Sequence, residues 1–121
     1  MVFRRRRHRA RLSAVAERIG ARNGVVLKDA FSGGRGANGP LVLGVITLRD
    51  GEPGEILREQ LENAAAGGYA GPPKYTEADG CGFIGVPDLP MLIIKTFAAG
   101  KVIPLHGEVP PGRTGVVVSL T

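Results

Sequence analysis

The sequence predicts an α+β domain in which two helices pack on one face of an antiparallel sheet. Two segments have the spacing of amphipathic helices and five have the composition of strands, in the order α-β-β-α-β-β-β. A chain of 121 residues, 43% of them hydrophobic, suits a single domain with its own core. We expect a ferredoxin-like sandwich or a relative of it.

The first half of the chain is predicted to form a helix followed by a hairpin. Leu12, Val15 and Ile19 follow the spacing of one apolar stripe and predict a helix over residues 10–22. The next strands are expected at residues 25–31 (VVLKDAF) and 41–49 (LVLGVITLR). The second is a nearly continuous apolar run, which is typical of a strand buried on both faces. The stretch between them reads as a loop.

The second half is predicted to contain one helix and three strands. The helix is expected over residues 55–66, because Pro53 suits a first helical position and two glycines follow Ala66. The next segment is rich in glycine and proline and reads as irregular, with a short strand at 74–77. Strands are then expected at the ranges 91–98, 101–105 and 115–120. Pro104 confines the strand at 101–105 to a sheet edge.

Positive charge is concentrated at the start of the chain. Residues 1–22 hold eight arginines and one acid, for a net charge of +7, whereas the remaining 99 residues carry −2; together they make the formal +5. We divide the chain into a basic N-terminal arm, residues 1–9, and a domain over residues 10–121. The predicted polyanion-binding side chains are Arg4, Arg5, Arg6, Arg7, Arg9 and Arg11.

Several partners would suit this arm. Adjacent guanidinium groups repel one another, and each presents a planar fork of donors that matches phosphate. Nucleic acid or another polyanion is therefore one expected partner, and an acidic protein surface is another. An anionic membrane surface is a third, although no lipidation signal accompanies the arginines. The alternative is a solvated terminus that only improves solubility.

Catalytic candidates are few. Cys81 stands between two glycines, and His106 is the base that could activate its thiol if the fold brings them together. A small enzyme or ligand-binding domain with its site near Cys81 and His106, in the glycine- and proline-rich 67–90 region, is thus the alternative function. Gly34 and Arg35, in the loop between the first two strands, are candidates for cradling a phosphate, or they form only a hairpin tip.

Other functional classes have no motif to support them. One cysteine and two histidines make a poor metal-ligand set, and no nucleotide-binding glycine motif is present, so we expect no metal and no cofactor. No long apolar run is present, and a cytoplasmic protein is expected. The predicted edge strands at 101–105 and at the C-terminus favour self-pairing, hence a homo-oligomer. The leading interpretation is a non-catalytic interaction or assembly module.

Overall fold

The structure is a computed structural model that describes residues 2–33 and 40–121, with side chains from residue 6 onward in the first stretch. Its helices and strands are α1 (Val2–Arg18), β1 (Val25–Gly33), β2 (Leu41–Asp50), α2 (Pro53–Ala66), β3 (Tyr75–Glu77), β4 (Gly80–Phe83), β5 (Leu92–Phe97), β6 (Val102–Ile103), β7 (Gly107–Glu108) and β8 (Arg113–Leu120). Six of the strands form one sheet in the order β1-β2-β8-β5-β4-β3, and β6 pairs with β7. Every ladder is antiparallel, which confirms the α+β class.

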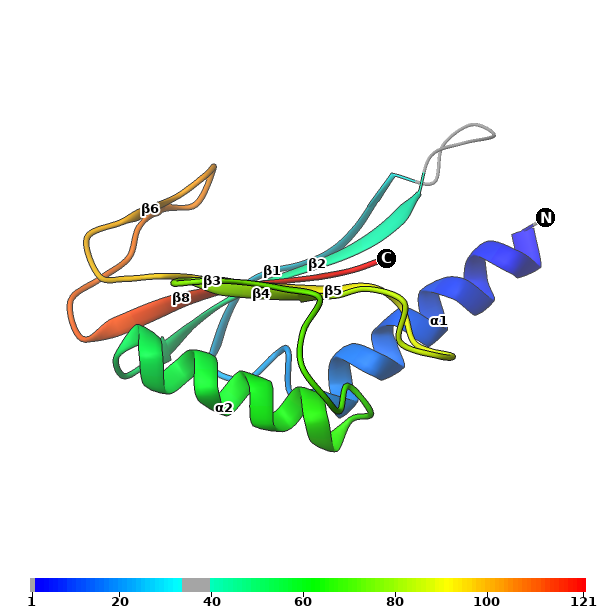
Figure 1. The fold of residues 1–121 in the computed structure, drawn as a ribbon. Coiled ribbons are helices and arrows are strands. Elements are labelled where there is room, and N and C mark those ends of the chain that lie inside the picture. Colours follow the sequence, from blue (N-terminus) through cyan, green and yellow to red (C-terminus); the bar gives the residue numbers. More distant parts are fainter. Residues whose placement is uncertain (1, 34–39) are drawn as a thin grey trace.

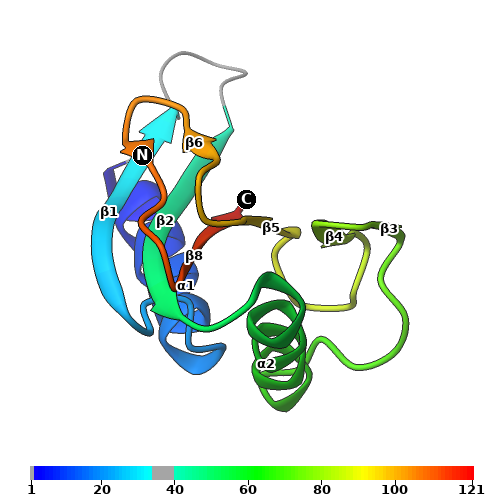
Figure 2. The same ribbon diagram turned by 90° about the vertical axis from the view of Figure 1, so that its left-hand side faces the viewer.

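The molecule has three layers. Both helices lie on one face of the sheet, and the β6–β7 hairpin rises from the opposite face (Figure 1). Helix α1 contacts β2, whereas α2 contacts β5 and β8, so the two helices cover different halves of the sheet (Figure 2). We call the face that carries the hairpin the open face, because neither of the two described helices covers it.

The main core lies between the helices and the sheet. The apolar stripe predicted on the first helix is buried there: Leu12 and Ile19 are inaccessible to solvent. They pack in one cluster with Leu43 of β2 and Val118 of β8. The sequence has few aromatic residues, and this core is accordingly built mostly from aliphatic side chains.

The C-terminal strand lies in the middle of the sheet, not at an edge as predicted. β8 pairs with β2 from Leu43↔Leu120 onward and with β5 from Leu92↔Leu120 onward. Strands β2 and β5 pair with its backbone along both edges, whereas its side chains are covered by the helix-side core on one face and partly by the β6–β7 hairpin on the other. The predicted strand at 101–105 is only the two-residue β6, which pairs with β7 and does not join the main sheet. The edges of the sheet are β1 and β3.

Helix α1 also differs from the prediction. It begins at Val2, within the segment assigned to a separate arm, and ends at Arg18, four residues before the predicted end. Arginine is a good helix former, and neighbouring side chains on a helix diverge by about 100°, which reduces their mutual repulsion. The arginine run is therefore the first part of a helix whose second part is buried in the core.

The short strand expected at 74–77 is confirmed, whereas the expected topology of the sheet is not. The short strand expected near 74–77 is present as β3, and it pairs with β4, which the sequence analysis did not predict. A ferredoxin-like topology is not confirmed, because the elements do not follow the β-α-β-β-α-β order of that fold and the main sheet has six strands in the order β1-β2-β8-β5-β4-β3.

Candidate functional site

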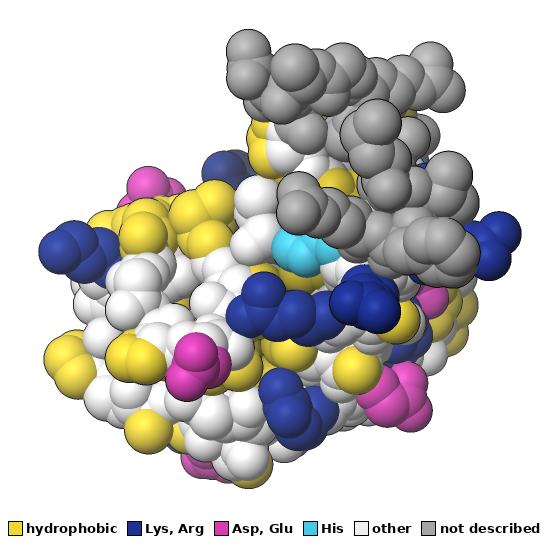
Figure 3. Space-filling model, turned by 90° about the vertical axis from the view of Figure 1, so that its right-hand side faces the viewer, with side chains coloured by type: hydrophobic (Ala, Val, Ile, Leu, Met, Phe, Trp, Pro, Cys, Tyr) yellow, Lys and Arg dark blue, Asp and Glu magenta, His cyan; other side chains and the backbone are white. Residues whose placement is uncertain are grey.

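The basic side chains of α1 are distributed around the helix. Arg7, Arg11 and Arg18 share one side, because positions separated by four and eleven residues nearly superpose on a helical wheel. Arg6 and Arg9 lie on the other flank, and all five side chains are exposed. Figure 3 shows several Lys and Arg side chains on this end of the molecule. The arrangement is a helix that presents guanidinium groups in more than one direction.

These guanidinium groups lack acidic partners. All eleven Asp and Glu residues belong to the described parts of the chain. Within those parts, no carboxylate lies within 4.0 Å of the charged groups of Arg6, Arg7, Arg9, Arg11 and Arg18. By contrast, Arg22 pairs with Glu17 at 3.3 Å and with Asp29 at 2.6 Å. The positive charge of these five side chains is thus left to solvent or to an external anion.

Two contacts fix the basic half of α1 to the body. The guanidinium of Arg9 lies over the ring of Phe31 on β1, 5.1 Å from its centroid. Arg11 donates a hydrogen bond of 2.8 Å to the backbone carbonyl of Asp88. The guanidinium groups of Arg9 and Arg11 thus each contact a residue outside α1.

Two buried polar side chains hold the other end of α1. The carbonyl of Ile19, which follows the helix, accepts a hydrogen bond of 2.7 Å from Nε2 of Gln60 on α2. Arg49 of β2 donates to the carbonyls of Gly20 and Ala21, each at 3.3 Å, and burial lowers the pKa of this guanidinium. The carbonyls at a helix C-terminus need such donors, and a cation there also suits the helix dipole.

The structure does not bring the two catalytic candidates together. Cys81 of β4 belongs to the core cluster on the helix side of the sheet, and burial raises the pKa of its thiol. His106 lies in the turn between β6 and β7, which stands on the open face. A thiol is a poor nucleophile when burial keeps it protonated. Gly34 and Arg35 lie outside the described residues.

The tyrosines of the 67–90 region have packing roles. Tyr69 is buried, donates a hydrogen bond of 2.7 Å to the carbonyl of Pro90, and meets Phe83 edge to face at 5.5 Å. The ring of Tyr75 lies directly over Gly82, where a Cβ atom would collide with it. The ring contacts and the hydrogen bond of these tyrosines thus serve packing within the fold.

The open face carries a groove that the sequence analysis missed. It has a volume of about 420 Å³ and runs between the sheet and the hairpin. Its lining residues are Ile46, Ile93, Lys95, Phe97, Ile103, Pro104, Val117 and Ser119. Strand β5, with the sequence LIIKTF, has no polar–apolar alternation that would reveal this face, and the position of the hairpin depends on packing between distant segments.

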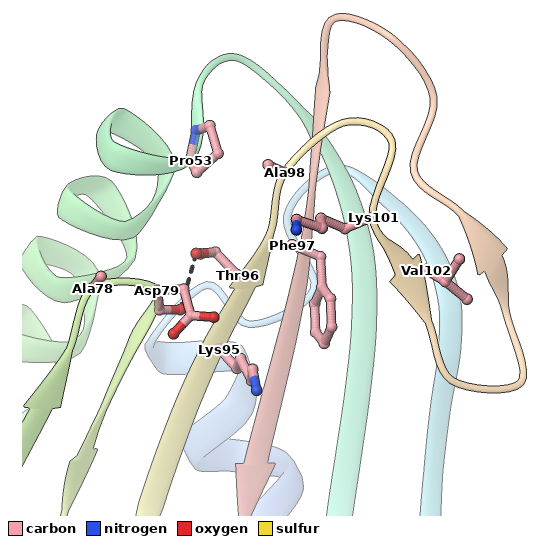
Figure 4. Close-up of a pocket in the computed structure, with 9 residues that line it drawn as sticks. All are labelled: Pro53, Ala78, Asp79, Lys95, Thr96, Phe97, Ala98, Lys101 and Val102. Atoms are coloured by element: carbon pink, nitrogen blue, oxygen red, sulfur yellow. Dashed lines mark hydrogen bonds between the residues drawn. The ribbon is translucent and has the colours of Figure 1, made fainter.

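A second hollow adjoins this groove at the end of β5. Figure 4 shows Lys95 and Lys101 among its lining residues, together with Asp79 from the turn before β4. The backbone carbonyl of Asp79 accepts a 2.9 Å hydrogen bond from the hydroxyl of Thr96. The Nζ atom of Lys95 lies 5.6 Å from the centroid of the Phe97 ring. Opposite charges therefore border the apolar groove.

Metal binding and membrane spanning find no support in the described part of the chain. No group of three His, Cys, Asp or Glu residues there could hold a metal ion. Neither helix, over its described residues, is long and apolar enough to span a membrane.

Comparison with protein-family models, with curated proteins and with solved structures finds no match to this chain. The exposed arginines of α1 and the groove on the open face are therefore the features that bear on function.

Proposed function

We propose that this protein is a non-catalytic interaction module that binds nucleic acid through the arginines of α1. The observation that supports the proposal is the set of exposed guanidinium groups on α1 without a carboxylate partner. Eleven carboxylates are available in the chain, and they leave these five arginines unneutralised. An external polyanion would supply the missing negative charge.

The geometry of α1 suits a phosphate backbone. Arg7 and Arg18 are separated by eleven residues, or about 16 Å along a helix axis. A nucleic-acid duplex carries one negative charge per roughly 1.7 Å of its axis, so this length meets several phosphates. Guanidinium groups on a fixed helix also lose less conformational entropy on binding than those on a free arm.

Such binding should be steeply dependent on salt. If four arginines each contact one duplex phosphate, affinity should fall about 150-fold between 50 mM and 200 mM salt. The interaction should show little preference for sequence, because contacts to phosphate carry no base information.

A charge-matched pair of variants tests the proposal. The double variant Arg6→Gln/Arg7→Gln removes two exposed charges from α1, and Lys28→Gln/Arg58→Gln removes two exposed charges from β1 and α2. Fluorescence anisotropy with a labelled 20-bp duplex should show at least about tenfold weaker binding for the first variant, with a salt slope reduced by about two. The second should stay within about threefold of wild type.

Two results would contradict the proposal. Equal weakening by both variants would mean that only overall charge matters, not α1. Equally tight binding of the wild-type protein to polyglutamate would mean that the partner is an acidic polypeptide surface and not a nucleic acid.

A further inference from the structure

The open face is apolar where a solvent-facing sheet would be polar. The three central strands β2, β8 and β5 are in register, so that alternate residues share this face. On it lie Val42, Gly44, Ile46, Leu48, Gly115, Val117, Ser119, Ile93, Lys95 and Phe97. Only Lys95 and Ser119 of these are polar. An antiparallel sheet with one face in water normally alternates apolar and polar residues, so this face needs a cover.

The protein's own hairpin covers only part of the open face. Ile103 and Val109 of the hairpin region are buried against Ile46. Gly115 makes this possible, because a Cβ atom there would collide with the side chain of Ile103. The hairpin is thus anchored over one end of the sheet, and the groove beside it remains open with Ile93 and Val117 in its lining.

The hairpin exposes apolar side chains that add nothing to the packing of a single copy. Leu105 is 99% exposed and Val102 is 62% exposed. Leu105 also has a φ of 67°, a left-handed conformation that is unusual for leucine. A large apolar residue held in this conformation and fully in water is the kind of feature that a partner surface explains.

We infer that the open face is the interface of a homodimer in which two copies meet face to face about a twofold axis. The hairpin stands at one end of the sheet and the bare part of the face at the other (Figure 1). A twofold axis can therefore place each hairpin on the bare part of its partner. Leu105 of each copy then packs on the apolar groove of the other, as a central interface anchor does.

The charges around the open face favour a second copy over a charged ligand. Glu77, Asp79, Lys95 and Lys101 line the hollows on and beside this face, two of each sign. In a twofold interface each residue can meet one of opposite sign, so such a balanced set is self-complementary. Helix α1 lies on the opposite face of the sheet, so dimerisation keeps the two arginine-rich helices apart.

The area of the open face is also large enough for a stable dimer interface. Six strands at about 4.8 Å spacing, with about seven residues per central strand, give a sheet of roughly 24 by 24 Å. That is a flat projection near 600 Å², and side-chain relief and the outer surface of the hairpin add to it. A stable dimer buries about 800 Å² of accessible surface per partner, which this face can supply.

Two leucine substitutions test the interface. Leu105→Glu places a charge on the hairpin, and Leu27→Glu places the same charge on the edge strand β1, where Leu27 is 40% exposed. Analytical ultracentrifugation at 1–200 µM and 300 mM salt, without nucleic acid, should show wild type and Leu27→Glu at twice the 12.7 kDa chain mass. Leu105→Glu should raise the dissociation constant at least about tenfold. Because Leu105 touches solvent on all sides, its replacement should leave the far-UV circular dichroism spectrum unchanged.

A second variant tests the bare part of the face. Ser119→Arg adds a charge to the groove without removing an apolar group, and it should also weaken the dimer. A wild-type protein that stays monomeric at 200 µM would overturn the proposal, and so would dissociation by Leu27→Glu but not by Leu105→Glu. The latter result would assign the contact to β1. Because nucleic acid is absent from this measurement, dimerisation and polyanion binding can each fail without the other.

Discussion

Replacing Arg49 with methionine tests whether a buried cation holds the C-terminal end of α1 in place. Arg49 is 6% exposed and reaches the carbonyls of Gly20 and Ala21, just beyond α1, as well as the hydroxyl of Thr47 at 3.2 Å. Methionine has a similar shape but no donors. The Arg49→Met variant would remove a donor from both carbonyls, although that of Gly20 still accepts a hydrogen bond of 3.2 Å from the backbone N–H of Asn23.

The expected loss of stability follows from these three hydrogen bonds. Bonds to a charged group contribute about 1.5–3 kcal/mol each, and donor–acceptor distances of 3.2–3.3 Å favour the lower value. Three such bonds contribute about 4–5 kcal/mol, a figure that already includes the cost of desolvation. The carbonyl of Gly20 keeps a second donor, which reduces the expected loss by about 1.5 kcal/mol. We expect a net decrease of about 3 kcal/mol in the free energy of unfolding.

Urea denaturation followed by circular dichroism at 222 nm measures this quantity. The matched control is Arg58→Met, an exposed arginine on α2, which should change the free energy of unfolding by less than about 0.5 kcal/mol. An Arg49→Met variant as stable as wild type, or more stable, would refute the reasoning. It would show that desolvation of the guanidinium outweighs its hydrogen bonds, as it does for some buried ion pairs.

Two further predictions concern buried groups on the helix side of the sheet. Burial raises the pKa of Tyr69 from 10.0 to about 12, because the folded protein favours the neutral phenol. The stability that the buried phenol contributes should therefore be complete below pH 10 and should be lost as the pH rises toward 12. Urea titrations between pH 9 and 12 should show this decline in wild type and a weaker one in Tyr69→Phe, and parallel declines would contradict the assignment. The thiol of Cys81 is buried and its pKa is raised, so it should react with 5,5′-dithiobis(2-nitrobenzoate) at least about a hundredfold faster in 6 M guanidinium chloride than in the native state. Rapid native labelling at pH 8 would show that the thiol is accessible.

The amphipathic elements could be predicted from the sequence because local periodicity determines them. The stripe of Leu12, Val15 and Ile19 is buried as expected. Strand β2 was expected to be buried on both faces, but it is buried on the helix side and only half-buried at Val42, Gly44 and Leu48 on the open face. The central position of β8 could not be predicted, because the register joining Leu43 to Leu120 depends on packing across the whole chain. Strand β4 was missed because its sequence, GCGF, has two glycines and little strand propensity.

The candidate surfaces were predictable to different degrees. The arginines of α1 are visible in the sequence as a charge cluster, but their place on a packed helix depends on contacts such as Arg9 with Phe31. The separation of Cys81 from His106 is decided by which face of the sheet each element occupies. The groove on the open face is invisible in the sequence, because it exists only where the hairpin stands over strands that are distant along the chain.

The insertion of β8 between β2 and β5 has a consequence for how this protein acquires its structure. Leu43 pairs with a residue 77 positions further along the chain, and contacts between such distant residues form slowly. Until β8 arrives, β2 and β5 each carry an unpaired row of backbone donors and acceptors in an apolar setting. A partly folded chain that lacks this strand is therefore the species most exposed to aggregation through intermolecular strand pairing.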